Sequence, residues 1–447
     1  MRHAIHGFTG ELVLPGNPAY EVARRTQDDT VDRRPAVIAR CRDSGDVAAA
    51  LRHARETGLA VRVRGGGHGP DRFAIDDDAM VIDLASMRAV HVDSTGPRVR
   101  VEGGATWRDV DRATQAHGRA VTGARIPSVG VAGFTLGSGS GWLERKLGLA
   151  ADRLRRARVV TADAQLVTAS AEEHPDLFWA LRGGGPSFGI VTELEFALHP
   201  IDEVAAGLLA WPLDHAAAVT SAYAELMADA PDDLGGGLAL LNGAPFVPAP
   251  LRSTPLIAVL VVWTGAGDAP VSPLRALGPA LDFVRPMPYA HLQAMFESPE
   301  PYTARLHGVG GFLTELSPQV VAVLADHQRS KPAPEGSMLV QPLGGAVARG
   351  DARSSPLGGR DAPWAYQAGA AWFDPDADPA VADWAASLQA ALAPYTIGEA
   401  WPNFIPERDA TRLRAAYGAD IWGRLQAIRA CWDPDDVFSA GHAIALP

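Results

Sequence analysis

Cysteine is scarce in this chain, whose 447 residues include only two, Cys41 and Cys431. Thiols this few and this far apart argue against a disulfide framework and against a cysteine-rich zinc site. We therefore expect neither of these, and no metal ion.

Basic charge is also in short supply. The 40 lysine and arginine residues face 52 aspartate and glutamate residues, which leaves a formal net charge of -12. Nucleic acids and anionic membrane surfaces are bound by basic faces, so this balance argues against both kinds of partner. We expect a small-molecule substrate instead, and the sequence leaves open whether two copies form a homodimer.

Long apolar runs are missing as well. The sequence has no run of about 18 apolar residues, so we expect no membrane span. Residues 1–7 lack the apolar core of a signal peptide. Together these absences favour the cytoplasm.

The remaining composition is that of a globular protein, with 47% hydrophobic and 21% charged residues. A chain of this length is expected to form two or three domains. Short strands and helices alternate at first, whereas longer alternating strands mixed with helices follow. We predict an α+β protein made of an N-terminal segment (1–32), a first domain (33–203), a second domain with an antiparallel sheet covered by helices (204–400), and a tail (401–447).

The most informative motif is Arg64-Gly-Gly-Gly-His68-Gly69, in which the alternating strand Val61–Arg64 runs directly into three glycines. Three glycines allow backbone conformations closed to other residues and let a flat ligand approach closely. Their N–H groups can also surround an anion such as a pyrophosphate. A histidine at the end of such a loop stands where the ligand must lie. Taken alone, the string is equally well explained as a tight turn.

A second glycine-rich stretch runs from Val129 to Trp142, with glycines at 130, 133, 137, 139 and 141. We interpret it as a long backbone wall with accessible N–H groups. It differs from the dinucleotide fingerprint, which needs a strand before it, a helix after it and an acidic residue about 20 residues further on. A third stretch is Leu177–Val191, which also contains several glycines. Taken alone, the second stretch is equally well explained as an ordinary glycine-rich loop.

Together and in this order, the motifs resemble the FAD-binding domain of the vanillyl-alcohol-oxidase superfamily, in its berberine-bridge-enzyme-like branch. Residues Gly103–Asp111, Asn403-Phe404 and Asp433–Phe438 add to the resemblance, which covers nearly the whole chain. It implies a PCMH-type FAD-binding domain of two subdomains at 33–203, with FAD between them and its ring facing the sheet of the second domain, and a tail that returns to the first domain. The residues implied to bind FAD are Arg64, Gly65, Gly66, Gly67, His68, Gly69, Gly123, Val129, Gly130, Gly133, Gly137, Ser138, Gly139, Gly141, Trp142, Gly189, Val191, Asn403 and Phe404.

The resemblance also implies a covalent cofactor. His68 would be bonded through a ring nitrogen to the 8α-methyl group of the flavin, a bond expected to raise the redox potential. Many members of the branch add a second bond from a cysteine just before the second motif. Residues Gly123–Gly130 contain no cysteine, so we predict a single covalent link.

The tail departs from the branch at the position of its usual catalytic tyrosine, which is Trp401 in this chain. An indole is only a donor and a stacking surface, so Trp401 is no base near neutral pH. Candidate replacements, which the sequence does not rank, are Tyr366, Tyr302, His307 and Glu399. We take Tyr366 and Trp401 as the candidate catalytic residues. A substrate with an already acidic O–H, such as a hydroquinone, would need no strong base.

The resemblance implies an FAD-linked oxidase. A bulky secondary metabolite, such as an alcohol, a phenol or a hydroquinone, would give a hydride to FAD, and molecular oxygen would take the electrons as H2O2. Tailoring and resistance oxidases of bacterial antibiotic pathways, including those that act on mitomycin-type quinones, fit this description. Two alternatives stay open: a flavoprotein that reoxidises or sequesters a reduced quinone drug, and an enzyme with structural FAD whose pocket shapes a cyclisation.

Overall fold

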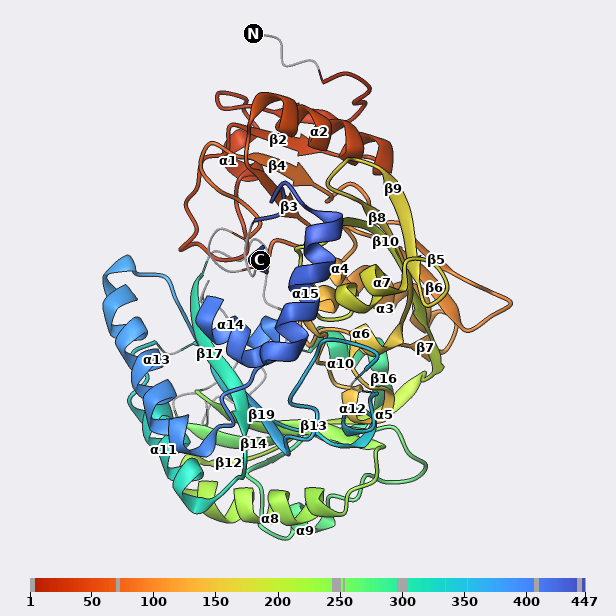
Figure 1. Ribbon diagram of the computed structural model, residues 1–447. Helices are drawn as coiled ribbons and strands as arrows, with labels where there is room; N and C mark the ends of the chain where they lie inside the picture. Colours follow the sequence, from red (N-terminus) through yellow and green to blue (C-terminus); the bar gives the residue numbers. More distant parts are fainter. Residues whose placement is uncertain are drawn as a thin grey trace.

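A computed structural model of the chain shows two parts and a tail that returns along both (Figure 1). It describes residues 5–69, 73–242, 251, 254–295, 297, 304–333, 335–351, 353–405, 410–439 and 444–446. Helices alternate with sheets whose strands are mostly antiparallel, which confirms the predicted α+β class. Within these ranges, no helix is long and apolar enough to cross a membrane.

The first subdomain contains a four-stranded sheet, ordered β1 (Glu11–Val13), β2 (Val37–Arg40), β4 (Met80–Asp83) and β3 (Val61–Arg64). Beside it lie α1 (Tyr20–Ala23) and α2 (Ser44–Thr57). Helix α2 begins where the Asp43 side chain accepts the N–H of Asp46, and it ends at Gly58 with φ +70°. Strand β1 pairs with β2, so the segment 1–32, which we set apart from the first domain, supplies an edge strand of this sheet.

The second subdomain contains a five-stranded antiparallel sheet, ordered β5 (Val90–Val92), β6 (Arg98–Glu102), β10 (Ile190–Ala197), β8 (Leu154–Val160) and β9 (Leu166–Ser170). It is accompanied by α3 (Trp107–Gln115), α4 (Val131–Gly137), α5 (Glu144–Leu147), α6 (Ala150–Arg153) and α7 (Pro175–Leu181), and by the paired short strands β7 (Arg119–Ala120) and β11 (His199–Pro200). Helix α4 corrects our interpretation of this stretch as a backbone wall. Burial of Val131, Ala132 and Leu136 outweighs the poor helix propensity of its glycines.

The second part of the chain is built on an eight-stranded sheet. Its main path is β15 (Leu281–Asp282), β12 (Glu203–Pro212), β14 (Leu256–Trp263), β13 (Leu234–Leu241), β18 (Ser337–Pro342), β19 (Trp364–Trp372) and β17 (Arg305–Leu313), with β16 (Arg285–Pro288) also paired to β12. One face packs against α8 (Ala216–Ala228), α11 (Pro318–Arg329) and α13 (Asp378–Leu392), which lie along the bottom and left of Figure 1. The other face meets the second subdomain, where Trp142 and Leu143 share a buried cluster with Leu260. Shorter helices in this part are α9 (Ser272–Arg275), α10 (Tyr289–Ala294) and α12 (Gly345–Ala348).

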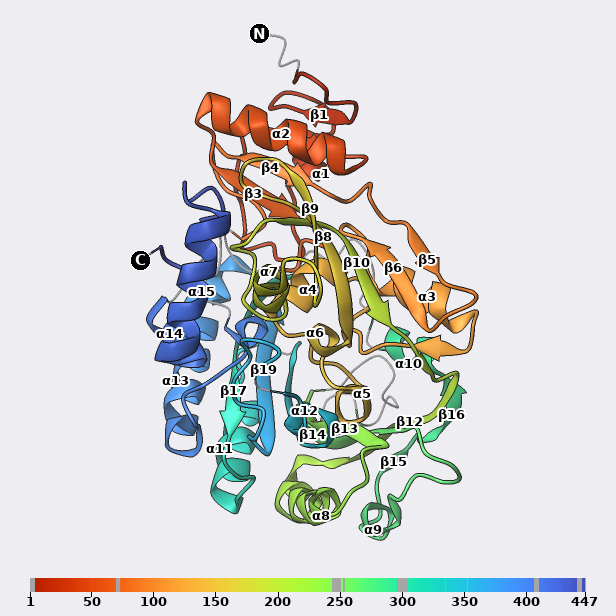
Figure 2. The same ribbon diagram turned by 45° about the vertical axis from the view of Figure 1, so that its right-hand side comes forward.

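The tail lies against the second subdomain (Figure 2). Its helices are α14 (Ala410–Tyr417) and α15 (Ala419–Trp432). Arg424 of α15 pairs with Asp176 of α7 at 3.1 Å. After α15, the buried Asp433 accepts the N–H groups of Val437 and Phe438 at 2.7 and 2.9 Å. The Asp433–Phe438 motif is therefore a structural turn that follows α15.

Candidate cofactor and substrate site

The glycine–histidine loop starts at a buried arginine. Arg64, the last residue of β3, pairs with Asp83 at 2.6 Å and also donates to the carbonyl oxygens of Ala23 and Arg25. These partners all belong to the protein. The structure thus gives this predicted cofactor residue the role of fixing the start of the loop.

The loop packs directly on the start of α4. A Cβ atom on Gly66 would overlap the backbone N and Cα of Gly130, and a Cβ atom on Gly130 would overlap Gly66 in the same way. Gly67 has φ +70°, a conformation that favours glycine. The first and second motifs are therefore in backbone contact, and this contact excludes side chains on both of its partners.

His68 lies half-buried at the end of this loop. Its Nε2 atom is 3.0 Å from the Oγ atom of Ser128, just before α4. This bond holds the imidazole beside Val129 and Gly130, which we also predicted as cofactor-binding residues. Ser128 was not predicted, because a single serine outside a motif carries no signal in the sequence.

One face of α4 is bare of side chains. Gly133 is exposed, and a Cβ atom there would meet nothing within 4 Å. One turn further on, Gly137 lies under Asn403, whose Nδ2 donates to the carbonyl oxygen of Phe134 at 2.8 Å. The bare face is therefore bounded by the glycine loop at one end and by the tail at the other. Such a face fits a flat cofactor, because backbone alone would meet it.

Several other predicted cofactor residues pack within the protein. Gly139 has φ +85°, and its carbonyl oxygen accepts the N–H of Ala150 at 2.9 Å. A Cβ atom on Gly141 would overlap the carbonyl oxygen of Gly123. The Oγ atom of Ser138 is buried and finds no hydrogen-bond partner in the described part of the chain, as suits a residue beside a polar ligand.

The third motif serves the sheet of the second subdomain. Gly189 has φ +136° and lies against Val159 of the neighbouring strand. Val191, on β10, is buried, and its carbonyl oxygen lies where a Cβ atom on Gly103 would be. Trp142, from the second motif, is buried under the guanidinium of Arg125, which lies 5.0 Å from its ring centroid.

An amide pair, absent from our predictions, joins this site to the second part of the chain. The Oγ atom of Ser140 donates to Oε1 of Gln341 on β18 at 3.0 Å, and Nε2 of Gln341 lies 3.3 Å from Oε1 of Gln367 on β19. Gln341 is fully buried. The neighbours Val340 and Tyr366 pack toward the helices, so both glutamines point to the opposite face, toward the two subdomains. The sequence did contain one signal for this pair, which is a polar residue at an inward-facing position of an otherwise apolar strand.

The two candidate catalytic residues lie elsewhere. Tyr366 is buried in the cluster that contains Trp384 of α13, on the face of β19 opposite Gln367. Trp401 is only 1% exposed, and its indole N–H donates to the carbonyl oxygen of Gly358 at 3.0 Å. Neither side chain points toward the amide pair. The alternation of side chains along β19 turns Tyr366 to the other face, and Trp401 is enclosed in the core.

The two other candidate bases that the structure describes, His307 and Glu399, make no hydrogen bond to the amide pair. His307 is exposed on β17, and it shares its side of the strand with Val309, which packs toward the helices. Burial raises the pKa of Glu399, whose Oε2 lies near Gly358. Tyr302 lies outside the described residues. The described part of the site thus offers amides and a hydroxyl, which fits the alternative of a substrate that needs no strong base.

Trp401→Phe should therefore affect stability more than chemistry. The indole packs edge-on against Phe312 at 5.0 Å between ring centroids, and phenylalanine keeps much of that contact but leaves the carbonyl oxygen of Gly358 without its donor. We expect a loss of about 2 kcal/mol in the free energy of unfolding, measured with urea, and an unchanged flavin content. A large loss of kcat at full flavin content would contradict this role.

Beneath the Gly123–Gly130 segment lies a buried carboxyl group. Gln293, on α10, donates to Oδ2 of Asp111 at 3.1 Å and to the carbonyl oxygen of Ala124 at 2.9 Å. Burial raises the pKa of Asp111 from 3.8 to about 7. The folded protein therefore holds a proton on Asp111 that the unfolded chain releases at lower pH.

This raised pKa predicts a stability that falls as pH rises. A group whose pKa is raised by folding stabilises the protein fully at pH values below its pKa in the unfolded chain. That stabilisation is lost as the pH rises to the pKa in the folded protein, here from about pH 4 to about pH 7. Asp111→Asn should remove this slope, and above pH 7 it should gain up to about 4 kcal/mol relative to the wild type. Urea unfolding at several pH values measures the difference, with the exposed Asp376→Asn as the control. If the free energy of unfolding depended on pH in the same way for Asp111→Asn and the wild type, the raised pKa of Asp111 would be refuted.

Comparisons with known proteins agree with this geometry. Residues 35–170 match a family model described as an FAD binding domain. The chain is 30% identical to the (R)-6-hydroxynicotine oxidase of Paenarthrobacter nicotinovorans, over 97% of this chain and 96% of that relative. A crystal structure of 6-hydroxy-D-nicotine oxidase from Arthrobacter nicotinovorans matches with a TM-score of 0.88 at 27% identity, over 100% of this chain and 99% of that one. The BBE-like 1 protein of Physcomitrella patens shares the fold, with a TM-score of 0.86 at 20% identity over 98% and 97% of the two chains.

Proposed function

This chain belongs to the FAD-linked oxidoreductases of the vanillyl-alcohol-oxidase superfamily, and from that premise we propose that it oxidises a bulky secondary metabolite with molecular oxygen as the electron acceptor. When bound, FAD supplies a two-electron acceptor that O2 regenerates, with H2O2 as the product. The observation that supports this function is a convergence: Gly66 meets Gly130, His68 meets Ser128, and Asn403 meets Gly137. Two distant motifs and the tail thus border one side-chain-free face.

Each residue of the site has its own role in this proposal. The bare face at Gly133 admits the cofactor, His68 holds it through one covalent bond, and Ser128 orients the imidazole. Gln367, half-buried beside Gln341, would bind a polar group of the substrate, while Ser140 of the second motif holds Gln341 in place. Amides donate and accept hydrogen bonds but take no proton near neutral pH. The substrate is therefore one whose oxidation needs no side-chain base, such as a hydroquinone, an acidic phenol or an amine.

The name of the similar (R)-6-hydroxynicotine oxidase makes 6-hydroxynicotine a sensible first test compound beside hydroquinones. The purified protein should show a flavin absorption spectrum that bleaches when a substrate is added without oxygen. Admission of air should restore the spectrum and release H2O2, measured with a peroxidase-coupled dye. A photoreduced protein that air reoxidises no faster than free reduced FAD would rule out an oxidase.

The lack of a base among the described site residues also favours a second candidate function, binding of a quinone drug without turnover. Such a protein would bind the drug tightly, but its flavin would not bleach under anaerobic conditions. The third alternative, a cyclisation with structural FAD, would give product without oxygen uptake. Anaerobic bleaching and oxygen uptake together separate the three functions.

The amide pair provides a test that leaves cofactor binding intact. Gln367→Ala removes an acceptor from Gln341 and one polar contact to the substrate, so kcat/KM should fall about tenfold at unchanged flavin content. The exposed Gln319→Ala on α11 is the matched control. An unchanged kcat/KM would place the substrate elsewhere.

A further inference from the structure

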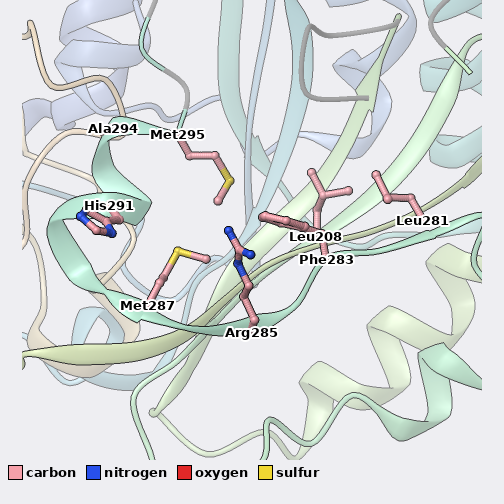
Figure 3. A pocket seen from close by; sticks show the side chains of 8 residues that line it. All are labelled: Leu208, Leu281, Phe283, Arg285, Met287, His291, Ala294 and Met295. Carbon is pink, nitrogen blue, oxygen red and sulfur yellow. The ribbon is translucent and has the colours of Figure 1, made fainter. Parts of the chain in front are cut away.

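A cavity of about 420 Å³ lies away from the proposed redox site, between the β12 edge of the large sheet and α10. Its walls are largely apolar, with Leu208, Leu281, Met287 and Met295 among the residues that line it (Figure 3). Hollows of this size hold small ligands when a few polar groups fix the orientation of the ligand.

The polar groups of this cavity carry only one sign of charge. Arg285 and His291 line it, and none of its lining residues in the described part of the chain is acidic. Figure 3 shows the guanidinium of Arg285 reaching into the space between Met287 and Met295. Among the described residues, it makes no hydrogen bond or ion pair, and it stacks over the Phe283 ring at 4.2 Å. Arg285 is exposed to solvent on β16, so its guanidinium stands at the open side of this apolar hollow, where the anionic group of a ligand can meet it.

The cavity is separate from the amide pair, although both lie on the same face of the sheet. Leu208 pairs with Leu260 on β14, and Leu260 pairs with Gly237 on β13, the strand next to that of Gln341. Three strand spacings correspond to about 14 Å. The cavity is lined by none of the residues of the glycine loop, α4 or the amide pair.

Helix α10 lies between the cavity and the Gly123–Gly130 segment. His291 and Ala294 of α10 line the cavity, while Gln293 on the same helix donates to the carbonyl oxygen of Ala124. An occupant would therefore lie one helix away from Gly123–Gly130 without touching it.

We propose that this cavity is a second binding site, which takes an apolar monocarboxylate with its carboxylate on Arg285 and its apolar body between the methionine and leucine side chains. The ligand is distinct from the redox substrate. The guanidinium and a carboxylate match in planar, two-pronged geometry, and the apolar walls remove the rest of the molecule from water. A ligand bound in this way contacts neither the amide pair, Gln341 and Gln367, nor the Gly123–Gly130 segment.

Calorimetric titration of the flavin-loaded protein with decanoate tests the proposal, with decanol and decylamine as uncharged and cationic comparisons. We expect one decanoate per chain, with decanol and decylamine binding at least about tenfold more weakly. Arg285→Gln should weaken decanoate binding about tenfold while decanol binding stays the same. The fully exposed Arg353→Gln is the matched control and should bind decanoate like the wild type.

A second variant covers the case in which Arg285→Gln fails to fold. Ala294→Trp fills the cavity from the exposed side of α10 and should abolish decanoate binding, with an unchanged flavin spectrum. The proposal is overturned if wild type binds no decanoate at millimolar concentration, or if decanol binds as tightly as decanoate. It is also overturned if a folded Arg285→Gln protein binds decanoate as tightly as the wild type, if decanoate binding survives in a folded Ala294→Trp protein, or if it is lost in Gln367→Ala, because the ligand would then occupy another site.

Discussion

Wild-type protein precipitated with acid should carry its yellow colour into the pellet, whereas His68→Ala should release all of its flavin into the supernatant. The prediction rests on the position of His68 at the end of a loop in which Gly66 contacts Gly130 and leaves no side chain in the way. A covalent bond survives unfolding, while contacts that depend on the fold do not. Absorption spectra of pellet and supernatant measure the partition directly.

The control for this experiment is His91→Ala, which removes an exposed histidine of β5 and should leave the flavin in the pellet. Ser128→Ala separates orientation from attachment, because it removes the hydroxyl that lies 3.0 Å from the imidazole but keeps the reactive ring. We expect partial release from Ser128→Ala, since a misaligned ring forms the bond less completely. Flavin in the wild-type supernatant would show that the cofactor is held without a covalent bond.

The sequence predicted the loop well because its signals are local. An alternating strand followed by three glycines specifies a strand end and a turn, and β3 ends at Arg64 as expected. The second motif was predicted less well. Its many glycines suggested a loop, but burial of the apolar side chains of α4 stabilises a helix, and the glycines instead leave one helix face bare.

The catalytic candidates illustrate the limit of reading residues one at a time. Tyr366 and Gln367 are neighbours in sequence, and only the pairing of β19 within the sheet decides which of them points toward the subdomains. Trp401 occupies the position that the resemblance marked, but the carbonyl oxygen of Gly358 takes its indole N–H. The bond from Ser140 to Gln341 joins residues 201 positions apart, so no local pattern could have revealed it.

Gly66→Ala should strongly reduce both flavin loading and stability. A single added methyl group would overlap the backbone N and Cα of Gly130, and backbone atoms have no alternative rotamer to adopt. Gly130 is further held because the next residue, Val131, donates its N–H to the carbonyl oxygen of Ala105 at 2.9 Å. The loop must therefore move away from α4 and take His68 with it. We expect a loss of about 1–3 kcal/mol in the free energy of unfolding and a flavin-to-protein ratio well below that of the wild type.

The same substitution at Gly133 is the matched control, since a methyl group there meets no protein atom within 4 Å. Alanine also favours a helix by about 1 kcal/mol over glycine, so Gly133→Ala should leave the cofactor-free protein equally or more stable. Its flavin loading should nevertheless fall if the cofactor lies over the bare face of α4, because the methyl group occupies that face. Unfolding in urea and the flavin-to-protein ratio thus separate the two positions: Gly66→Ala should lose on both measures, and Gly133→Ala on loading alone. Full loading in both variants would place the cofactor away from α4 and would remove the basis for assigning His68 as its attachment point.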